Sequence, residues 1–223
     1  MSVTTGGPAT LLRTPAPRTA TIAPYSSAPP PAPAPTAPSG IVAHDDLLPF
    51  DEQKALHDFL KGPGWAYGAF SDAAGSRYLY KHFAGVVTDG REAVDPDAFE
   101  ASLEDTAPLV ASVWRRLKGT HLSGHRLTRC YANGYPNGSE GGLHRDSNIA
   151  THYTAIYYPH LSWKPNYAGE TVFFDDAEQE IVGSVYPRPN RLVVFPGNIP
   201  HVARGVSRAC PDMRITLMFK TAI

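Results

Sequence analysis

The spacing of hydrophobic and polar positions changes near residue 125. Before that point, apolar residues recur mostly at helical intervals in two segments. The first ends at Gly62-Pro63-Gly64, and its apolar positions are Leu48, Ala55, Leu56, Phe59 and Leu60. The second runs from Phe99 to Leu117, and we expect Pro108 in the first turn of its later half with Thr106 as the cap. The first part of the chain is therefore predicted to be helical.

After residue 125, short stretches rich in Tyr, Val, Phe, Ile and Thr alternate with Gly, Pro and Asn turns. The stretches are Leu127–Tyr131, Tyr153–Tyr158, Thr171–Phe174, Ile181–Tyr186, Arg191–Phe195, His201–Val206 and Arg214–Phe219. Many short strands at this spacing are typical of a sandwich or barrel. We therefore predict a mainly β fold of the α+β kind, a barrel or jelly roll whose N-terminal helices pack on one sheet.

Composition separates the two ends of the chain. Residues 1–40 contain 10 of the 22 prolines and 8 alanines, and their only charged side chains are Arg13 and Arg18. Such a segment favours extended polyproline conformations, so we predict a disordered tail. A transit peptide is the alternative, although the prolines oppose an amphipathic helix. Residues 41–223 are long enough for one domain with one core, and the β core is expected from about residue 125 onwards.

Charge and cysteine content exclude several classes of function. With 20 Lys and Arg against 21 Asp and Glu, the net charge is −1, so we expect no nucleic-acid partner. No apolar run reaches membrane-spanning length, and no secretory signal is visible, so a cytoplasmic protein is expected unless the tail targets it to an organelle. Two cysteines cannot build a Cys-rich zinc module, whereas nine histidines permit a His and carboxylate metal site. The oligomeric state is not readable.

The motif with the clearest chemistry is His144-x-Asp146, because residues two apart on an extended chain point to the same side. The pair alone is weak evidence, since a second copy occurs at His44 and Asp46 in a segment expected to be plain surface chain. His201 opens a predicted strand further on. Two histidines and one carboxylate form the triad of non-haem Fe(II) proteins, which leaves coordination positions open for O₂ and a cosubstrate.

Arg214 supplies a second signal. In the predicted strand Arg214–Phe219, alternation places Arg214 and Thr216 on one face and the apolar residues on the other. An arginine that faces the inside of a barrel is costly unless it meets an anion. Because Asp146 is expected to bind the metal, a carboxylate ligand is the natural partner of Arg214.

Together these residues resemble the double-stranded β-helix core of the Fe(II)/2-oxoglutarate-dependent oxygenases, in the prolyl 4-hydroxylase-like branch. The similar stretches are Ala155–Tyr158 followed by Trp163-Lys164-Pro165, the turn Ala168-Gly169-Glu170-Thr171, and the closing pattern His201-Val202, Gly205-Val206-Ser207 and Arg214. The turn has Ala168 where the family has glycine, and Pro159-His160 and Asn198-Ile199-Pro200 also depart from the family pattern. The resemblance covers the chain from about Leu127 to Phe219.

The resemblance implies roles for named residues. His144, Asp146 and His201 would bind Fe(II), and Arg214 would bind the distal carboxylate of 2-oxoglutarate, with O₂ as the other cosubstrate. The remaining cosubstrate contacts that the resemblance implies are Thr216, Tyr158, Thr154 and Tyr131. No other catalytic residue is expected beyond the metal centre.

The activity implied is hydroxylation of an unactivated C–H bond with release of succinate and CO₂. Desaturation, cyclisation and epimerisation use the same cofactors and remain alternatives, as does a non-catalytic cupin-like metal-binding or sensor protein. The substrate class stays open among small molecules, free amino acids and peptidyl residues. The loop Asn133–Ser139 is expected near the mouth of the site.

Overall fold

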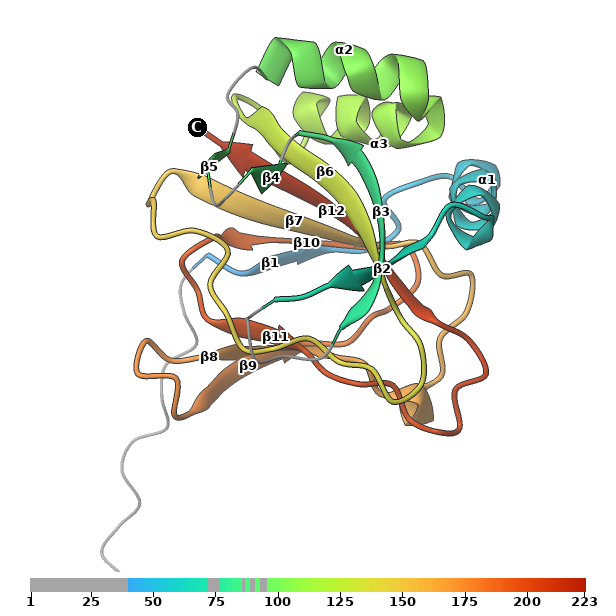
Figure 1. Ribbon diagram of the computed structural model, residues 1–223, viewed down its shortest axis with the longest axis vertical. Helices are drawn as coiled ribbons and strands as arrows, with labels where there is room; N and C mark the ends of the chain where they lie inside the picture. The colour runs from blue at the N-terminus through green and yellow to red at the C-terminus, as the bar shows by residue number, and fades with distance from the viewer. Residues whose placement is uncertain (1–39, 72–76, 86, 89–90, 93–95) are drawn as a thin grey trace, which may run out of the picture. The chain divides into compact units, whose positions relative to one another are not determined.

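The computed structural model describes residues 40–71, 77–85, 87–88, 91–92 and 96–223, and the predicted tail over residues 1–40 falls almost wholly outside them. Two β-sheets face each other in this part of the chain (Figure 1). The larger has the strand order β1-β10-β7-β12-β6-β3-β2 and the smaller the order β11-β8-β9. This antiparallel pair of sheets is the predicted jelly-roll architecture.

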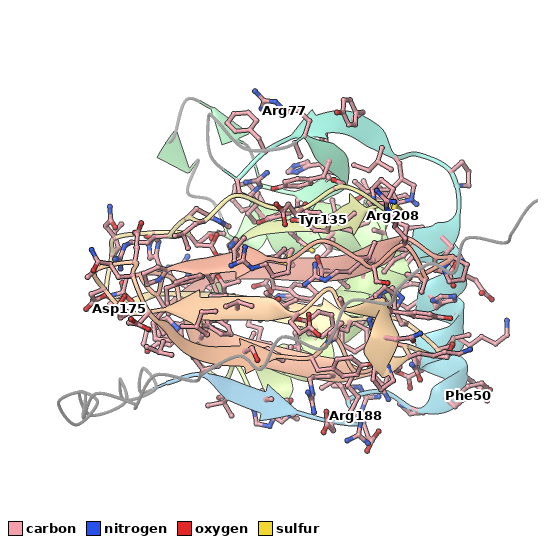
Figure 2. The ribbon with its side chains drawn as sticks, turned by 90° about the horizontal axis from the view of Figure 1, so that it is seen from below. Phe50, Arg77, Tyr135, Asp175, Arg188 and Arg208 are labelled. Carbon is pink, nitrogen blue, oxygen red and sulfur yellow. The ribbon has the colours of Figure 1, made fainter. Side chains whose placement is uncertain are left out.

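The strand bounds are close to those expected in the second half of the chain. The larger sheet consists of β1 (Val42–His44), β2 (Ala66–Ala69), β3 (Tyr78–Ala84), β6 (Arg126–Tyr135), β7 (His152–Tyr158), β10 (Arg191–Pro196) and β12 (Arg214–Ala222). The smaller consists of β8 (Thr171–Phe174), β9 (Ile181–Val185) and β11 (His201–Ala203), and β4 (Val87–Thr88) pairs with β5 (Arg91–Glu92). Figure 2 looks onto the smaller sheet, with Asp175 at the turn between β8 and β9.

The helices of the described residues alternate with the first strands and all come before β6. They are α1 (Phe50–Lys61), α2 (Pro96–Thr106) and α3 (Pro108–Gly119), and a 3-10 turn spans Pro165–Tyr167. In Figure 1, α2 and α3 lie on the side of the larger sheet opposite the smaller sheet. Leu56, Val110 and Trp114 from the helices join one core cluster with Leu217 and Phe219 from the sheet. This burial of apolar area fixes one face of the larger sheet and leaves the other face to the site.

Alternation along β6 and β12 divides their side chains between two environments. Leu217 and Phe219 pack toward the helices, whereas Met218 and Tyr131 belong to a second cluster between the sheets. Because successive side chains point to opposite faces, Arg214, Thr216, Met218 and Lys220 share the face that looks toward the smaller sheet. This face carries the polar residues of the site.

Several expectations about the first half of the chain are wrong in detail. Ala107 occupies the N-cap position of α3, and the hydroxyl of Thr106 donates instead to the carbonyl of Ser102 at 2.7 Å. Strands β1 to β3 were not expected from the sequence. Asn133 and Tyr135, expected in a loop, complete β6.

No helix among the described residues is long and apolar enough to cross a membrane.

Candidate metal centre and anion site

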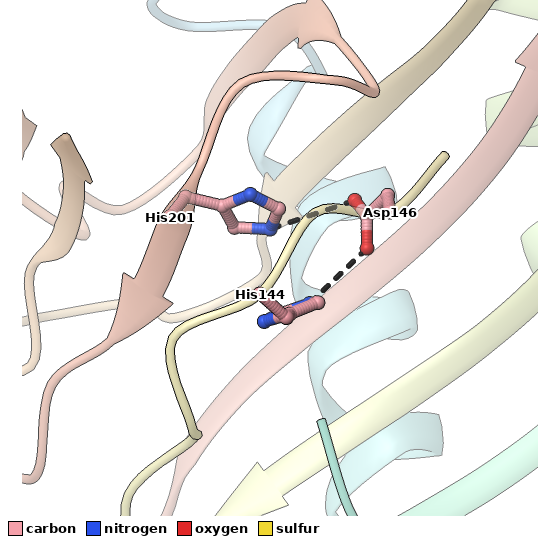
Figure 3. A group of neighbouring side chains, drawn as sticks. All are labelled: His144, Asp146 and His201. Atoms are coloured by element: carbon pink, nitrogen blue, oxygen red, sulfur yellow. Dashed lines mark hydrogen bonds and ion pairs between the residues drawn. The ribbon is translucent and has the colours of Figure 1, made fainter. Parts of the chain in front are cut away.

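His144, Asp146 and His201 converge between the two sheets, and their ligand atoms all lie within 4.8 Å of one another (Figure 3). Nε2 of His144 lies 3.2 Å from Oδ1 of Asp146, and Nε2 of His201 lies 3.5 Å from Oδ2. The side chains of Asp146 and His201 are 8% and 4% exposed. Two imidazole nitrogens and one carboxylate at this spacing can coordinate one divalent transition metal.

The backbone holds the three residues in place. His144 and His201 exchange both backbone hydrogen bonds, with N···O distances of 3.1 and 2.9 Å, and so form an antiparallel bridge. The amide of Asp146 donates to the carbonyl of Gly197 at 2.8 Å. The triad thus rests on two chain segments that are far apart in sequence and hydrogen-bonded to each other, which limits movement of the ligands.

Each histidine has one ring nitrogen committed to a backbone carbonyl. Nδ1 of His144 lies 2.9 Å from the oxygen of Gly142, and Nδ1 of His201 lies 2.9 Å from the oxygen of Ile199. A carbonyl oxygen only accepts, so Nδ1 is the donor in both rings and Nε2 is free to bind a metal. Burial lowers the pKa of His201 to about 4, although the Asp146 carboxylate opposes this. His201 is therefore neutral, the form that binds metals, near pH 7.

Asp146 is held by two side chains on its Oδ2 atom. The hydroxyl of Thr154 donates to Oδ2 at 2.5 Å, and the ammonium of Lys220 forms an ion pair with the same oxygen. Burial works against ionisation, but the positive charge of the Lys220 ammonium holds the pKa of Asp146 well below its ordinary value. The carboxylate is therefore ionised, with Oδ1 turned toward His144, as a metal ligand must be.

Arg214 lines a narrow cavity whose wall also includes His144 and His201. It is 1% exposed, and its Nη2 donates to the hydroxyl of Thr171 at 2.9 Å while its Nε donates to the carbonyl of Gly169. Within the described residues, no carboxylate forms an ion pair with Arg214. Both partners are neutral oxygens, so the positive charge of the buried guanidinium has no counter-ion in the part of the chain that the structure describes, and a bound anion would supply one.

The turn before β8 makes room for Arg214. Gly169 has φ of +86°, and a Cβ there would lie 3.0 Å from Cδ of Arg214 and 3.2 Å from a methyl of Val206. A side chain at this position would therefore press on Arg214 as well as strain the backbone. Ala168, which departs from the family pattern, also has a positive φ, of 56°. The glycine at 169 is thus required by both the turn and the cavity.

The remaining predicted residues occupy three locations around the site. Thr216 and Tyr131 line the narrow cavity together with Arg214, His144 and His201. Tyr158 is fully buried, and its hydroxyl lies 2.8 Å from that of Thr171, so it reaches Arg214 through Thr171. Thr154 was expected on the cosubstrate, but its hydroxyl donates to Asp146 and accepts a hydrogen bond from Lys220. The structure thus places Thr154 beside the metal centre and gives it a supporting position there.

Three further residues of the site were missed by sequence reasoning. Lys220 and Arg129 lie one alternation step beyond Met218 and Tyr131, so period-2 spacing, carried one position further, would have found both. The strand was expected to stop at Phe219, whereas β12 continues to Ala222. Thr171 stands within the predicted turn motif, but nothing in the sequence indicates that its hydroxyl accepts a hydrogen bond from Arg214.

A second, wider cavity of about 900 Å³ adjoins the triad. It shares His144 and Tyr131 with the narrow cavity and continues past Asp146 to Lys220 and Arg129. The metal centre therefore lies where two cavities meet, one that ends at Arg214 and one that opens beside Lys220. This arrangement allows two different molecules to approach one metal ion.

Comparison with known protein families gives one match. Residues 130–219 match the model of the 2OG-Fe(II) oxygenase superfamily, and this range contains the triad and Arg214. No curated protein sequence matches the chain.

Solved structures show the same fold at low identity. A prolyl-4-hydroxylase from Pseudomonas putida is 19% identical, with a TM-score of 0.52, over 82% of this chain and 92% of the other. A 2OG-Fe(II) oxygenase family protein from Burkholderia pseudomallei is 16% identical, with a TM-score of 0.58, over 82% and 85%. The alpha-ketoglutarate-dependent epimerase SnoN from nogalamycin biosynthesis is also 16% identical, with a TM-score of 0.51, over 82% and 76%. These similarities confirm the predicted double-stranded β-helix fold.

Proposed function

The β core of this chain belongs to the 2OG-Fe(II) oxygenase superfamily, and from that premise we propose that the protein hydroxylates an unactivated C–H bond of a small molecule, an amino acid or a peptidyl residue. The family defines an oxidoreductase whose cofactors are Fe(II) and 2-oxoglutarate. The observation that carries the proposal is the buried Arg214, which lines the same cavity as His144 and His201 without an acidic partner among the described residues.

The triad fits Fe(II) by its donor set and its protonation. His144 and His201 would bind through Nε2, because Nδ1 of each ring donates to a carbonyl. Asp146 would bind through Oδ1, because Thr154 and Lys220 occupy Oδ2. Three ligands leave positions for O₂ and 2-oxoglutarate, which together supply the oxidising chemistry. The protein contributes fixed ligand geometry and keeps the side chains of Asp146 and His201 almost fully buried.

Arg214 fits the distal carboxylate of 2-oxoglutarate. A buried guanidinium and a carboxylate form a charge-assisted pair that is stronger than an ordinary hydrogen bond. Thr216 and Tyr131 would line the cosubstrate along the cavity, and Thr171 with Tyr158 would orient Arg214 from behind. With 2-oxoglutarate in the narrow cavity, the wide cavity is left for the substrate.

Hydroxylation is the simplest outcome, but the fold also supports other outcomes after hydrogen abstraction. Desaturation, cyclisation and epimerisation are the alternatives, and one solved structure with this fold carries the name of an epimerase. A cupin-like protein that only stores or senses metal is disfavoured by Arg214, since such a protein has no use for a buried cation without a counter-ion. The substrate is a small molecule, an amino acid or a peptidyl residue.

The proposal is tested by following 2-oxoglutarate in the full-length protein loaded with Fe(II). In air, we expect succinate and CO₂ to form in equal amounts, slowly without substrate and faster with it. His201→Ala should abolish this turnover, while the exposed His121→Ala should retain it. An absence of succinate across a substrate screen, with iron bound, would contradict the proposed activity.

A further inference from the structure

The structure contains a second cationic position, at the opposite end of the β6–β12 ladder from Arg214. Arg129 and Lys220 are directly paired across the two antiparallel strands, in the register that pairs Arg214 with Tyr135. Six residues separate Arg214 from Lys220 along β12, or about 20 Å of extended strand. Both Arg129 and Lys220 line the wide cavity. We call this pair the Arg129–Lys220 pole.

Like charges that face each other on paired strands are destabilising. Lys220 is compensated by Asp146, but Arg129 has no ion-pair partner among the described residues. Its Nε is buried without a hydrogen-bond acceptor, and its guanidinium lies 4.2 Å from the ring centre of Tyr131. A side chain that is stacked, oriented and electrically uncompensated at a cavity wall is arranged to receive an anion from that cavity.

None of the other ionisable side chains that line the wide cavity among the described residues is a counter-ion for Arg129. The guanidinium of Arg145 donates to Asp176 and to the carbonyl of Asn198, so its positive charge is already paired with a carboxylate that does not line the cavity. His82 also lines the cavity, but a histidine carries no negative charge that could pair with Arg129. Asp146 is the only carboxylate among the described residues of this wall, and it is committed to Lys220 and the metal centre. A metal ion at the triad would add further positive charge beside the pole.

We propose that the wide cavity selects a small substrate that carries a carboxylate, bound by Arg129 next to Lys220, with an apolar or aromatic body against the tyrosines of the wall. This inference rests on the proposed function, because it assigns the wide cavity to the substrate. The cavity volume of about 900 Å³ is in the range of small-molecule sites. Since Lys220 contacts Asp146, the carboxylate would lie within a few bonds of the carbon that reacts.

Aromatic side chains surround the wide cavity, namely those of Tyr67, Phe70, Tyr78, Tyr80 and Tyr131. Two of them, Tyr67 and Phe70, are 72% and 54% exposed at its rim. Aromatic faces provide apolar contact to a flat or aliphatic body without adding charge. The combination of one oriented cation and aromatic walls therefore specifies an amphiphilic acid rather than a sugar or a nucleotide base.

The test uses full-length protein with Fe(II) and saturating 2-oxoglutarate under anaerobic conditions, so that added acids cannot occupy the Arg214 end. The probes are 3-phenylpropanoate, hexanoate and N-acetyl-leucine, each compared with its primary amide. Binding is read from perturbation of the visible absorption of the Fe(II)–2-oxoglutarate complex. We expect the acids to bind about 10-fold more tightly than the amides.

Arg129→Gln should reduce the preference for acids to less than about 3-fold, and Arg129→Lys should keep most of it. Neither variant should change the absorption with 2-oxoglutarate alone. Arg129→Gln should also keep or raise Tm, because it removes the like-charge pair with Lys220. A loss of several degrees would give Arg129 a structural role instead and overturn the proposal.

Two further outcomes decide against the inference. A wild-type protein that shows no preference for acids, including one that binds neither class, overturns it, as does an unchanged preference in Arg129→Gln. Failure of the proposed function looks different, because the Fe(II)–2-oxoglutarate absorption would then be absent before any probe is added, and the inference would fall with it.

Discussion

Arg214 and Arg129 lie at opposite ends of the same two strands, and their surroundings differ. Arg214 is almost fully buried and donates to Thr171 and Gly169, so its position is fixed by the fold. Arg129 rests on the face of Tyr131 with its Nε unpaired, opposite another cation. A cation that the fold holds in one position suits the cosubstrate, whose structure is always the same, whereas a cation with an unpaired Nε keeps a donor for a second ligand, the substrate.

The largest expected effect comes from removing the centre that separates the two ends. His201→Ala deletes a ligand of the metal, so iron binding and turnover should fall by at least about 100-fold, beyond what loss of a supporting residue costs. Iron content and succinate formation measure this effect. His121→Ala is the matched control. A His201→Ala protein that keeps wild-type turnover would show that the triad does not bind the catalytic metal.

The next effect tests the Arg214 end directly. Arg214→Ala should weaken 2-oxoglutarate binding by about 10–100-fold while iron binding is retained, because it removes a charge-assisted pair. Anaerobic titration measures both. The exposed Arg208→Ala is the matched control, and Arg214→Lys keeps the charge if the alanine variant folds poorly. An unchanged affinity for 2-oxoglutarate would show that Arg214 does not bind it.

Two threonines separate the metal end from the Arg214 end more finely. Thr154→Val removes the hydroxyl that donates to Asp146, so iron should bind about 10-fold more weakly with little change in 2-oxoglutarate affinity. Thr216→Val lies in the narrow cavity and should instead weaken 2-oxoglutarate by a few fold, with iron unchanged. Equal effects of both variants on both ligands would show that the two ends are not independent.

The last effect concerns the stability of the fold in acid and not the binding of either ligand. His160 accepts the backbone N–H of Ile215 at 3.1 Å, and burial, then the charge of Arg214, lowers the pKa of His160 to about 3. Between about pH 6.5 and pH 3, His160 is protonated in the unfolded chain and remains neutral in the folded chain. Stability should therefore fall as pH drops from about 6.5 toward 3, at about 1.4 kcal/mol per pH unit.

His160→Asn retains an acceptor for Ile215 but does not titrate, so its unfolding free energy should depend less steeply on pH, by about one proton. Chemical denaturation at several pH values measures the slope. Parallel pH profiles for the variant and the wild type would show that His160 is not the group responsible.

The second half of the fold was predictable from the sequence because strand alternation is strong there. The same alternation identified Arg214, whose charge stands out on an inward face. It failed at β3, where Lys81 points inward and donates to the carbonyls of Leu60 and Gly62 at the end of α1. A buried charge of this kind breaks the apolar period, and its acceptors come from a helix that the local pattern does not reveal.

The candidate site was predictable to the extent that its residues belong to motifs. His144, Asp146 and His201 were predicted to meet, and their ligand atoms do so. The support around them was not predictable, since Lys220 lies beyond the expected end of its strand and Thr154 contacts Asp146 across the loop that leads into β7. The Lys220 contact depends on how segments distant in sequence come together, and the Thr154 contact depends on the path of that loop; neither spacing nor composition records either one.

The most direct measurement of the central claim is an anaerobic titration of the full-length protein with Fe(II) and 2-oxoglutarate. A visible absorption should appear only when both are present and should saturate at one 2-oxoglutarate per chain. The absorption should require much more 2-oxoglutarate in Arg214→Ala. Iron that binds without producing this absorption in the wild-type protein would contradict the assignment of the triad and Arg214 to one site.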